Sequence, residues 1–229
     1  MSRAFLSRIA LRRDLPVQAV ARLLVPEETG RQFAAAHHLL WSLFADTPDR
    51  ERDFLWRQVE AGRFMALSIR KPVDAHGLFE IETRPFQPDL TEGDRLSFIL
   101  RANATVDRKS ANATRSKRHD IVMDALHPIA PGEARQVARD EAMGKAATEW
   151  LERQGTRAGF ALAAPVEVGG YEKLNLDRTG GRGKARFGVL DMSGEIRVQA
   201  PERLVPALLG GFGRARAFGC GLMLIRRAG

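Results

Sequence analysis

Near its C-terminus the chain reads Gly210-Gly211-Phe212-Gly213-Arg214-Ala215-Arg216-Ala217-Phe218-Gly219-Cys220-Gly221, with five glycines and two arginines. Residues 201–209 before it predict a helix that begins with proline, where the missing N–H is harmless. Residues 222–225 after it predict a buried strand. Free amides in a glycine-rich loop can cradle a phosphate, and arginine adds a planar, charged fork. A tight turn whose glycines permit close packing is the alternative interpretation.

Two familiar glycine motifs are excluded. A nucleotide-binding P-loop ends in Gly-Lys followed by Ser or Thr, and this loop contains no lysine. The dinucleotide fingerprint needs a third glycine where this chain has Arg216, and it follows a strand rather than a helix. The loop therefore indicates phosphate contact without indicating a nucleotide cofactor, and no cofactor is expected.

Charge points to a polyanionic partner. The 229 residues carry a formal net charge of +8, and 44% of them are hydrophobic, which suffices for a core. No apolar run is long enough to cross a bilayer, and the charged N-terminus does not resemble a signal peptide. The single cysteine, Cys220, fits a reducing cytoplasm and is expected to be a packing residue. Nucleic acid is thus favoured over a membrane as the partner.

The first part of the chain predicts a strand, a helix, a strand pair and further strands. The expected strands are 5–11, 54–59, 63–69, 79–83 and 95–102, with a tight turn at 61–62 and a helix over 29–45. Thr29 and Gln32 have the spacing of a capping box at the start of that helix. This order is typical of a split βαβ unit of ferredoxin-like type.

A second round follows a polar stretch, 103–119, which is predicted to be a linker or mobile loop. Helices are expected over 133–154 and 201–209, and strands over 159–168, 185–191, 196–198 and 222–226. The predicted fold class is α+β, with two tandem ferredoxin-like (RRM-like) domains, a basic cleft between their sheets and a C-terminal glycine-rich loop. The expected domains are 1–103, with the first helix, and 104–229, with the basic loops.

Positive residues gather in three loop regions, and low aromatic content argues against a base-stacking platform. We therefore expect recognition of backbone and shape in structured RNA or DNA. The alternative is a solvated charged surface. The candidate RNA-binding residues are Arg101, Arg108, Lys109, Arg115, Lys117, Arg118, Arg182, Lys184, Gly211, Gly213, Arg214, Arg216 and Gly219.

Candidate chemistry rests on histidine. No Cys/His cluster has zinc spacing, and no acidic pair is typical of a two-metal nuclease, so no metal is expected. Metal-free RNA cleavage needs a base for the 2′-OH, an acid for the leaving 5′-oxygen and cations for the extra charge. His37 lies at the edge of an apolar helical stripe, and His38 lies about 100° further round. From periodicity alone, a buried structural His37 and a solvated His38 are the simpler interpretations.

Several motifs occur in order along the chain. They are Phe5-Leu6-Ser7-Arg8-Ile9, His37-His38-Leu39-Leu40-Trp41-Ser42-Leu43-Phe44, Pro48-Asp49-Arg50-Glu51-Arg52-Asp53-Phe54-Leu55-Trp56, Leu100-Arg101-Ala102-Asn103 and the C-terminal glycine-rich loop. Together they resemble the CasE family, the CRISPR-repeat endoribonuclease of the type I-E Cascade complex. The resemblance spans both ends of the chain, and the glycine-rich loop is its most specific part.

The resemblance implies two tandem ferredoxin-like domains and metal-independent cleavage of CRISPR precursor RNA within the repeat hairpin, leaving a 2′,3′-cyclic phosphate or 3′-phosphate. It implies retention on the guide RNA hairpin together with the other Cascade subunits. It places the family's catalytic histidine on His37, with His38 in reserve. The tyrosine that many members carry three residues earlier is here Ala34.

Ala34 leaves the second proton-transfer group open among His38, Lys109, Lys117 and water. It also motivates an alternative function, a cleavage-deficient subunit that binds the hairpin RNA. A DNA-binding subunit of the same fold is a third hypothesis, based on charge alone.

Overall fold

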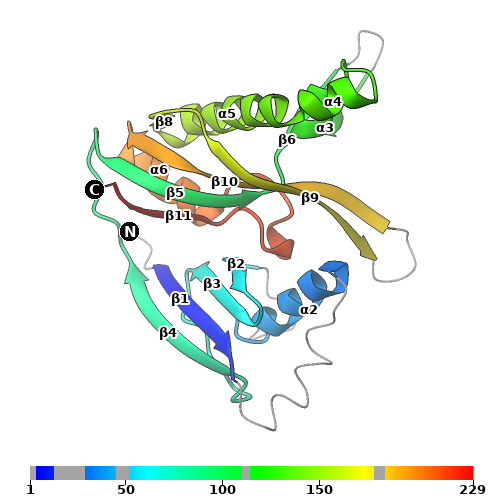
Figure 1. Cartoon of the computed structure of the whole chain (residues 1–229). Helices are drawn as coiled ribbons and strands as arrows, with labels where there is room; N and C mark the ends of the chain where they lie inside the picture. Colours follow the sequence, from blue (N-terminus) through cyan, green and yellow to red (C-terminus); the bar gives the residue numbers. More distant parts are fainter. Residues whose placement is uncertain (1–3, 13–28, 45–51, 110–113, 178–183, 229) are drawn as a thin grey trace.

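The structure, a computed structural model, describes residues 4–12, 29–44, 52–109, 114–177 and 184–228. Two antiparallel sheets dominate it, one above the other in Figure 1, and each carries helices. This agrees with the predicted α+β class.

The first sheet has the strand order β2-β3-β1-β4, and all neighbours in it are antiparallel. Its strands are β1 (Ala4–Leu11), β2 (Phe54–Glu60), β3 (Arg63–Ser68) and β4 (Phe79–Phe86). Alternation predicted β1 and β4, and the tight turn at 61–62 predicted the strand pair β2 and β3. Helix α2 (Thr29–Trp41) covers one face of the sheet, where Leu40 shares a core with Ile9 and Phe64.

Helix α2 ends earlier than the predicted 29–45. The Leu43 N–H donates to the Leu40 carbonyl at 3.1 Å, and the Phe44 N–H donates to the Trp41 carbonyl at 3.0 Å. These i to i+3 bonds tighten the chain into a turn. Leu43 and Phe44 are thereby buried, each 3% exposed. Residue 45 and the side chains of Thr29 and Gln32 lie outside the described part.

The second sheet has the order β11-β5-β10-β8, with β9 also paired to β10. Its strands are β5 (Arg95–Ala102), β8 (Phe160–Leu162), β9 (Glu167–Asp177), β10 (Lys184–Val198) and β11 (Met223–Arg227). Helices α5 (Arg139–Ala158) and α6 (Pro201–Gly210) share its core, in which Leu100, Trp150 and Leu204 are almost fully buried. Strand β10 runs unbroken through the two strands predicted at 185–191 and 196–198.

Strand β5 belongs to the second sheet, although the sequence assigned 95–102 to the first unit. It pairs with β10 on one side and β11 on the other. Alternation correctly placed Leu96, Phe98 and Leu100 on one face, and all three are buried. Alternation does not reveal which core that face joins, because this depends on residues from the other end of the chain.

The polar stretch 103–119 is more structured than the predicted linker. Strands β6 (Thr105–Arg108) and β7 (Lys117–Asp120) pair antiparallel, and a short helix, α3 (Ile121–Leu126), follows. The Asp120 carboxylate caps α3 by accepting from the N–H groups of Val122 and Met123 at 3.0 and 3.1 Å. The helix predicted over 133–154 is divided into α4 (Glu133–Val137) and α5 at Ala138.

The two sheets share apolar contacts. Leu6, Leu55 and Leu67 of the first sheet form a cluster with Leu222, which immediately precedes β11. Cys220 joins the core beneath α2. Part of the space where a basic cleft was predicted is therefore filled by apolar side chains.

Candidate functional site

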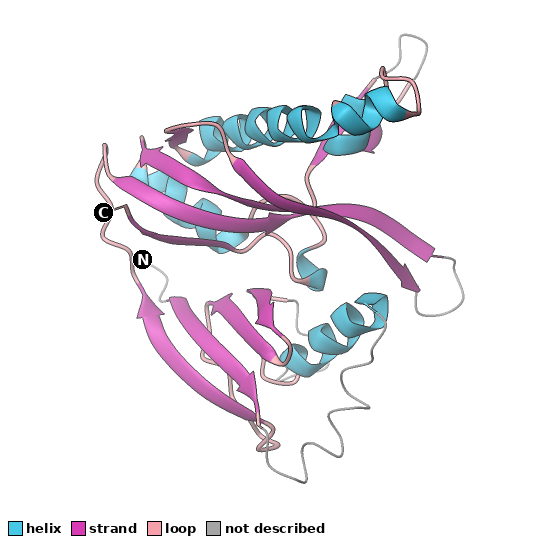
Figure 2. Cartoon of the chain, viewed as in Figure 1, coloured by secondary structure: helices cyan, strands magenta, loops and turns pink. Residues whose placement is uncertain are grey.

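His37 lies where α2 meets the glycine-rich loop. This loop contains one turn of 3₁₀ helix, η1 (Arg216–Phe218), which contacts α2 and β2. Figure 2 shows η1 as the short helix between the two sheets. The His37 ring centroid is 6.0 Å from that of Trp41 and 6.5 Å from that of Phe218. His37 is half-buried, whereas His38 is exposed, and their ring centroids are 5.6 Å apart.

The surroundings of His37 favour its neutral form. Burial lowers the pKa of His37 from its ordinary 6.5, and the nearby positive charges of His38 and Arg52 lower this pKa further. A neutral imidazole has one nitrogen that can accept a proton. His37 therefore has the protonation state of a general base at neutral pH.

Arg52, just before β2, is the cation that the sequence reasoning did not select. It is half-buried, and its Nη1 atom is buried without a hydrogen-bond partner among the described residues. The neighbouring carboxylate of Asp53 is occupied by Arg70, whose Nε and Nη2 donate to it at 2.6 and 3.0 Å. Burial and the charge of Arg216 both lower the pKa of Arg52. The only sequence signal was its place in the 48–56 motif.

The glycine-rich loop is held by hydrogen bonds within the loop and to strand β5. The Phe212 N–H donates to the Gly221 carbonyl at 2.9 Å, and the Gly221 N–H donates to the Arg101 carbonyl at 2.7 Å. The Arg216 guanidinium donates to the carbonyls of Gly211 and Gly213 at 3.0 and 3.3 Å. Arg216 thus organises the loop beside His37, while the side chain of Arg214 is exposed.

Close packing explains why the loop has glycine at these positions. A Cβ on Gly213 would lie 2.8 Å from the Asn103 carbonyl oxygen, and one on Gly219 would lie 3.1 Å from the Trp56 ring. The Trp56 Nε1–H in turn donates to the Ala217 carbonyl at 3.3 Å. These contacts favour the alternative interpretation of the motif, a tight turn. Phosphate contact by Gly211, Gly213 and Gly219 stays a prediction.

Arg101 faces carboxylates. Its guanidinium lies 2.5 Å from Asp191 and 2.8 Å from Glu172, and its side chain is 17% exposed. Arg57 of the first sheet reaches the same Asp191 at 3.3 Å. This carboxylate network joins the two sheets beside Cys220, whose burial raises the pKa of its thiol to about 12. The surroundings of Arg101 are those of a structural ion pair.

The predicted cations of the β6–β7 segment lie apart from His37. Strands β6 and β7 contact α3, whereas α2 contacts η1 and β9. Lys109, Arg115 and Lys117 are exposed there, and Arg118 pairs with Asp107 at 3.4 Å. Arg182 and the side chain of Lys184 lie outside the described residues.

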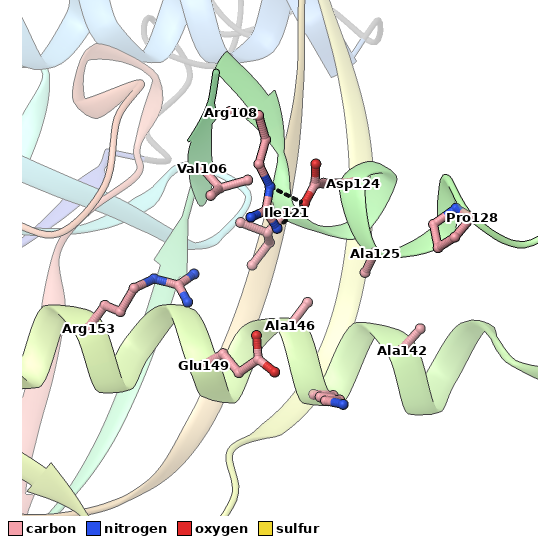
Figure 3. A pocket seen from close by; sticks show the side chains of 11 residues that line it. Val106, Arg108, Ile121, Asp124, Ala125, Pro128, Ala142, Ala146, Glu149 and Arg153 are labelled. Carbon is pink, nitrogen blue, oxygen red and sulfur yellow. Dashed lines mark hydrogen bonds and ion pairs between the residues drawn. The ribbon is translucent and has the colours of Figure 1, made fainter. Parts of the chain in front are cut away.

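Arg108 belongs to a different surface feature. Its guanidinium pairs with Asp124 at 2.7 Å across a hollow of about 430 Å³ between β6, α3 and α5 (Figure 3). Val106, Ile121 and Ala146 supply apolar parts of its lining. The hollow lies away from the His37 cluster, and Arg108 already has Asp124 as its counter-ion.

The described ranges contain neither a metal-binding cluster nor a membrane-spanning helix. Within them, His, Cys, Asp and Glu form no group of three that could hold a metal ion. The helices of the same ranges include none with the length and apolarity needed to cross a membrane.

Fold and site together define an α+β protein with two antiparallel sheets and a histidine–arginine cluster where they meet. The chain belongs to the family described as CRISPR associated protein, whose model matches residues 4–227.

The similar proteins cover nearly the whole chain. This chain is 26% identical over 210 residues to the "CRISPR system Cascade subunit CasE" of Escherichia coli strain K12. The match covers 89% of this chain and 96% of that protein. A structure of the CRISPR endoribonuclease Cse3 bound to 19 nt RNA is 25% identical, with a TM-score of 0.65 over 97% of this chain and 99% of that one. Thermus thermophilus Cse3, bound to an RNA representing a pre-cleavage complex, is 23% identical, with a TM-score of 0.65 over 98% and 99%.

Proposed function

We propose that this protein is a metal-independent endoribonuclease that cleaves CRISPR precursor RNA within the repeat hairpin and stays on the product as a Cascade subunit in the cytoplasm. The observation that carries the proposal is the position of His37, half-buried against the glycine-rich loop. Similarity along nearly the whole chain to Cse3 bound to RNA supports the substrate class.

The proposed reaction is an intramolecular transesterification. The 2′-oxygen forms a bond to the adjacent phosphorus while its proton passes to neutral His37. The bond from phosphorus to the 5′-oxygen breaks, and that oxygen takes a proton from an acid. The products are a 2′,3′-cyclic phosphate and a free 5′-hydroxyl. Of the candidates for the acid, His38 has its ring near His37, whereas Lys109 and Lys117 belong to the β6–β7 segment. This favours His38 or water.

We propose that the exposed cations hold the RNA hairpin. Arg214 on the glycine-rich loop and Lys109, Arg115 and Lys117 on the β6–β7 segment are exposed and suited to phosphate contact. Arg101 is better assigned to the contact between the sheets, because two carboxylates occupy its guanidinium.

The finer fold proposal is a ferredoxin-like duplication. The orders β2-β3-β1-β4 and β11-β5-β10-β8 are the antiparallel orders expected of split βαβ units. The pairing of β5 supports a division within 87–94 instead of after 103.

The alternative function is a hairpin-binding subunit that does not cleave, and Ala34 at the family's tyrosine position motivates it. One experiment separates the two functions. The CRISPR repeat RNA of the same genome is incubated in EDTA with the unmodified protein, with His37→Ala and with His38→Ala. Cleavage that His37→Ala abolishes supports the endonuclease, and tight binding of intact RNA supports the alternative. A matching DNA hairpin tests the third hypothesis, since equal affinity for DNA would favour it.

A further inference from the structure

We propose that Arg52 is a catalytic residue that binds the non-bridging oxygens of the scissile phosphate and stabilises the charge that develops on them. This inference rests on the proposed function. Arg52 combines burial, position and an unused hydrogen-bonding group, and the sequence patterns did not select it.

Among the described residues, the buried Nη1 of Arg52 lacks the hydrogen-bond acceptor that buried polar groups normally have. Its Nη1 is buried without an acceptor within the described ranges, and those ranges provide no ion pair for it. Asp53, the adjacent carboxylate, is held by two hydrogen bonds from Arg70. A buried N–H group without an acceptor is costly, and an anion bound from outside would satisfy the Nη1 group of Arg52.

The neighbours of Arg52 add positive charge. His37 and Arg216 interact with it electrostatically, and both lie at the contact of α2 with η1. Two N–H groups of Arg216 donate hydrogen bonds to the loop carbonyls of Gly211 and Gly213. Arg52 makes no such bonds with the described residues, so its planar guanidinium is available to bind a phosphate.

Arg52 could instead act only through His37, by keeping the imidazole neutral. The two roles predict different pH profiles. Replacement of Arg52 removes a positive neighbour, so the pKa of His37 rises and the cleavage rate reaches its plateau at higher pH. If Arg52 acts only through His37, its replacement leaves the plateau rate unchanged. If Arg52 stabilises the phosphate, its replacement lowers the cleavage rate at every pH, including the plateau.

The test measures single-turnover cleavage of the repeat RNA at saturating protein, in EDTA, across a pH series. We expect Arg52→Gln to lower the plateau by about 10²–10³-fold, the range for removal of one transition-state donor, and Arg52→Lys to retain part of the rate. Arg8→Gln is the matched control, because it removes the same charge from a side chain that is 70% exposed and paired with Glu82. Binding of RNA with a 2′-deoxy substitution at the mapped cleavage position and thermal unfolding accompany each variant.

A plateau equal to that of the unmodified protein overturns the proposal, whether or not its midpoint shifts. It is also overturned if Arg52→Gln weakens binding but cleaves normally at saturation, or if a loss of rate is matched by a loss of folded protein in both Arg52 variants. Failure of the unmodified protein to cleave is a separate result, which rejects the proposed function itself.

Discussion

His37 shows how the chemistry of a residue depends on parts of the chain that periodicity does not connect. The helical pattern correctly placed it at the edge of an apolar stripe. The Phe218 ring and Arg52 come from distant segments, and they add the burial and charge that lower the pKa of His37. Residue type and spacing therefore identified the candidate, while its protonation state required the three-dimensional arrangement.

The pH dependence of cleavage follows from that pKa. If His37 is the base, its neutral form is required, so the single-turnover rate should rise with pH and level off with a midpoint below 6.5. His38→Ala should move the midpoint upward, because the charge of His38 is one cause of the lowered pKa. Rates measured from about pH 5 to about pH 8 cover the histidine range. A rate that falls with rising pH would instead assign His37 the role of acid.

At the scale of elements, the sequence correctly predicted where the glycine-rich loop lies, but it did not reveal the packing contacts that require its glycines. Its place between a helix and a strand is confirmed by α6 and β11. The partners that require glycine, Asn103 and Trp56, lie far away in the sequence. The β6–β7 pair was missed for a different reason, because its strands are polar and short and carry no strong alternation.

Packing of the loop predicts the effect of an added methyl group. Gly213→Ala should destabilise the protein by about 1–3 kcal/mol, the typical cost of a strained backbone position. Gly213 has φ +74°, and its Cβ would meet the Asn103 carbonyl at 2.8 Å. Gly210→Ala is the control, since nothing lies within 4 Å of its Cβ. Urea unfolding measures both variants, and equal stability of the two would contradict the packing explanation.

The two loop arginines should behave differently. Arg214 is exposed, so Arg214→Ala should weaken RNA binding and reduce the salt slope of log Kd by about 1, as for one lost phosphate contact. Arg216→Ala should also lower Tm, because its hydrogen bonds to two loop carbonyls are lost. Titrations at several salt concentrations and thermal unfolding separate these effects. An unchanged slope for Arg214→Ala would show that Arg214 does not contact phosphate.

At the scale of the whole molecule, strand existence was largely predictable and strand partnership was not. The four strands of the first sheet were predicted, but their order was not, because β1 pairs with β3 and β4, which lie far away in the sequence. Strand β5 was assigned to the wrong unit because β10 and β11, its partners, come from the second half of the chain. Arg101 was selected for its charge, but its carboxylate partners Glu172 and Asp191 are visible only after folding.

The contact between the sheets should depend on Asp191, which holds Arg57 of the first sheet and Arg101 of the second. Asp191→Asn removes the negative charge that faces the guanidinium groups of Arg57 and Arg101. The side chains of these two arginines are each only 17% exposed. Removing one partner of a fully buried pair costs about 3–5 kcal/mol. Asp191 is 34% exposed and therefore partly screened by solvent, so we expect a loss of about 2 kcal/mol in the free energy of unfolding. Glu82→Gln, which breaks the exposed pair with Arg8, should cost no more than about 1 kcal/mol. Urea denaturation of both variants tests the difference, and equal losses would mean that the network does not couple the sheets.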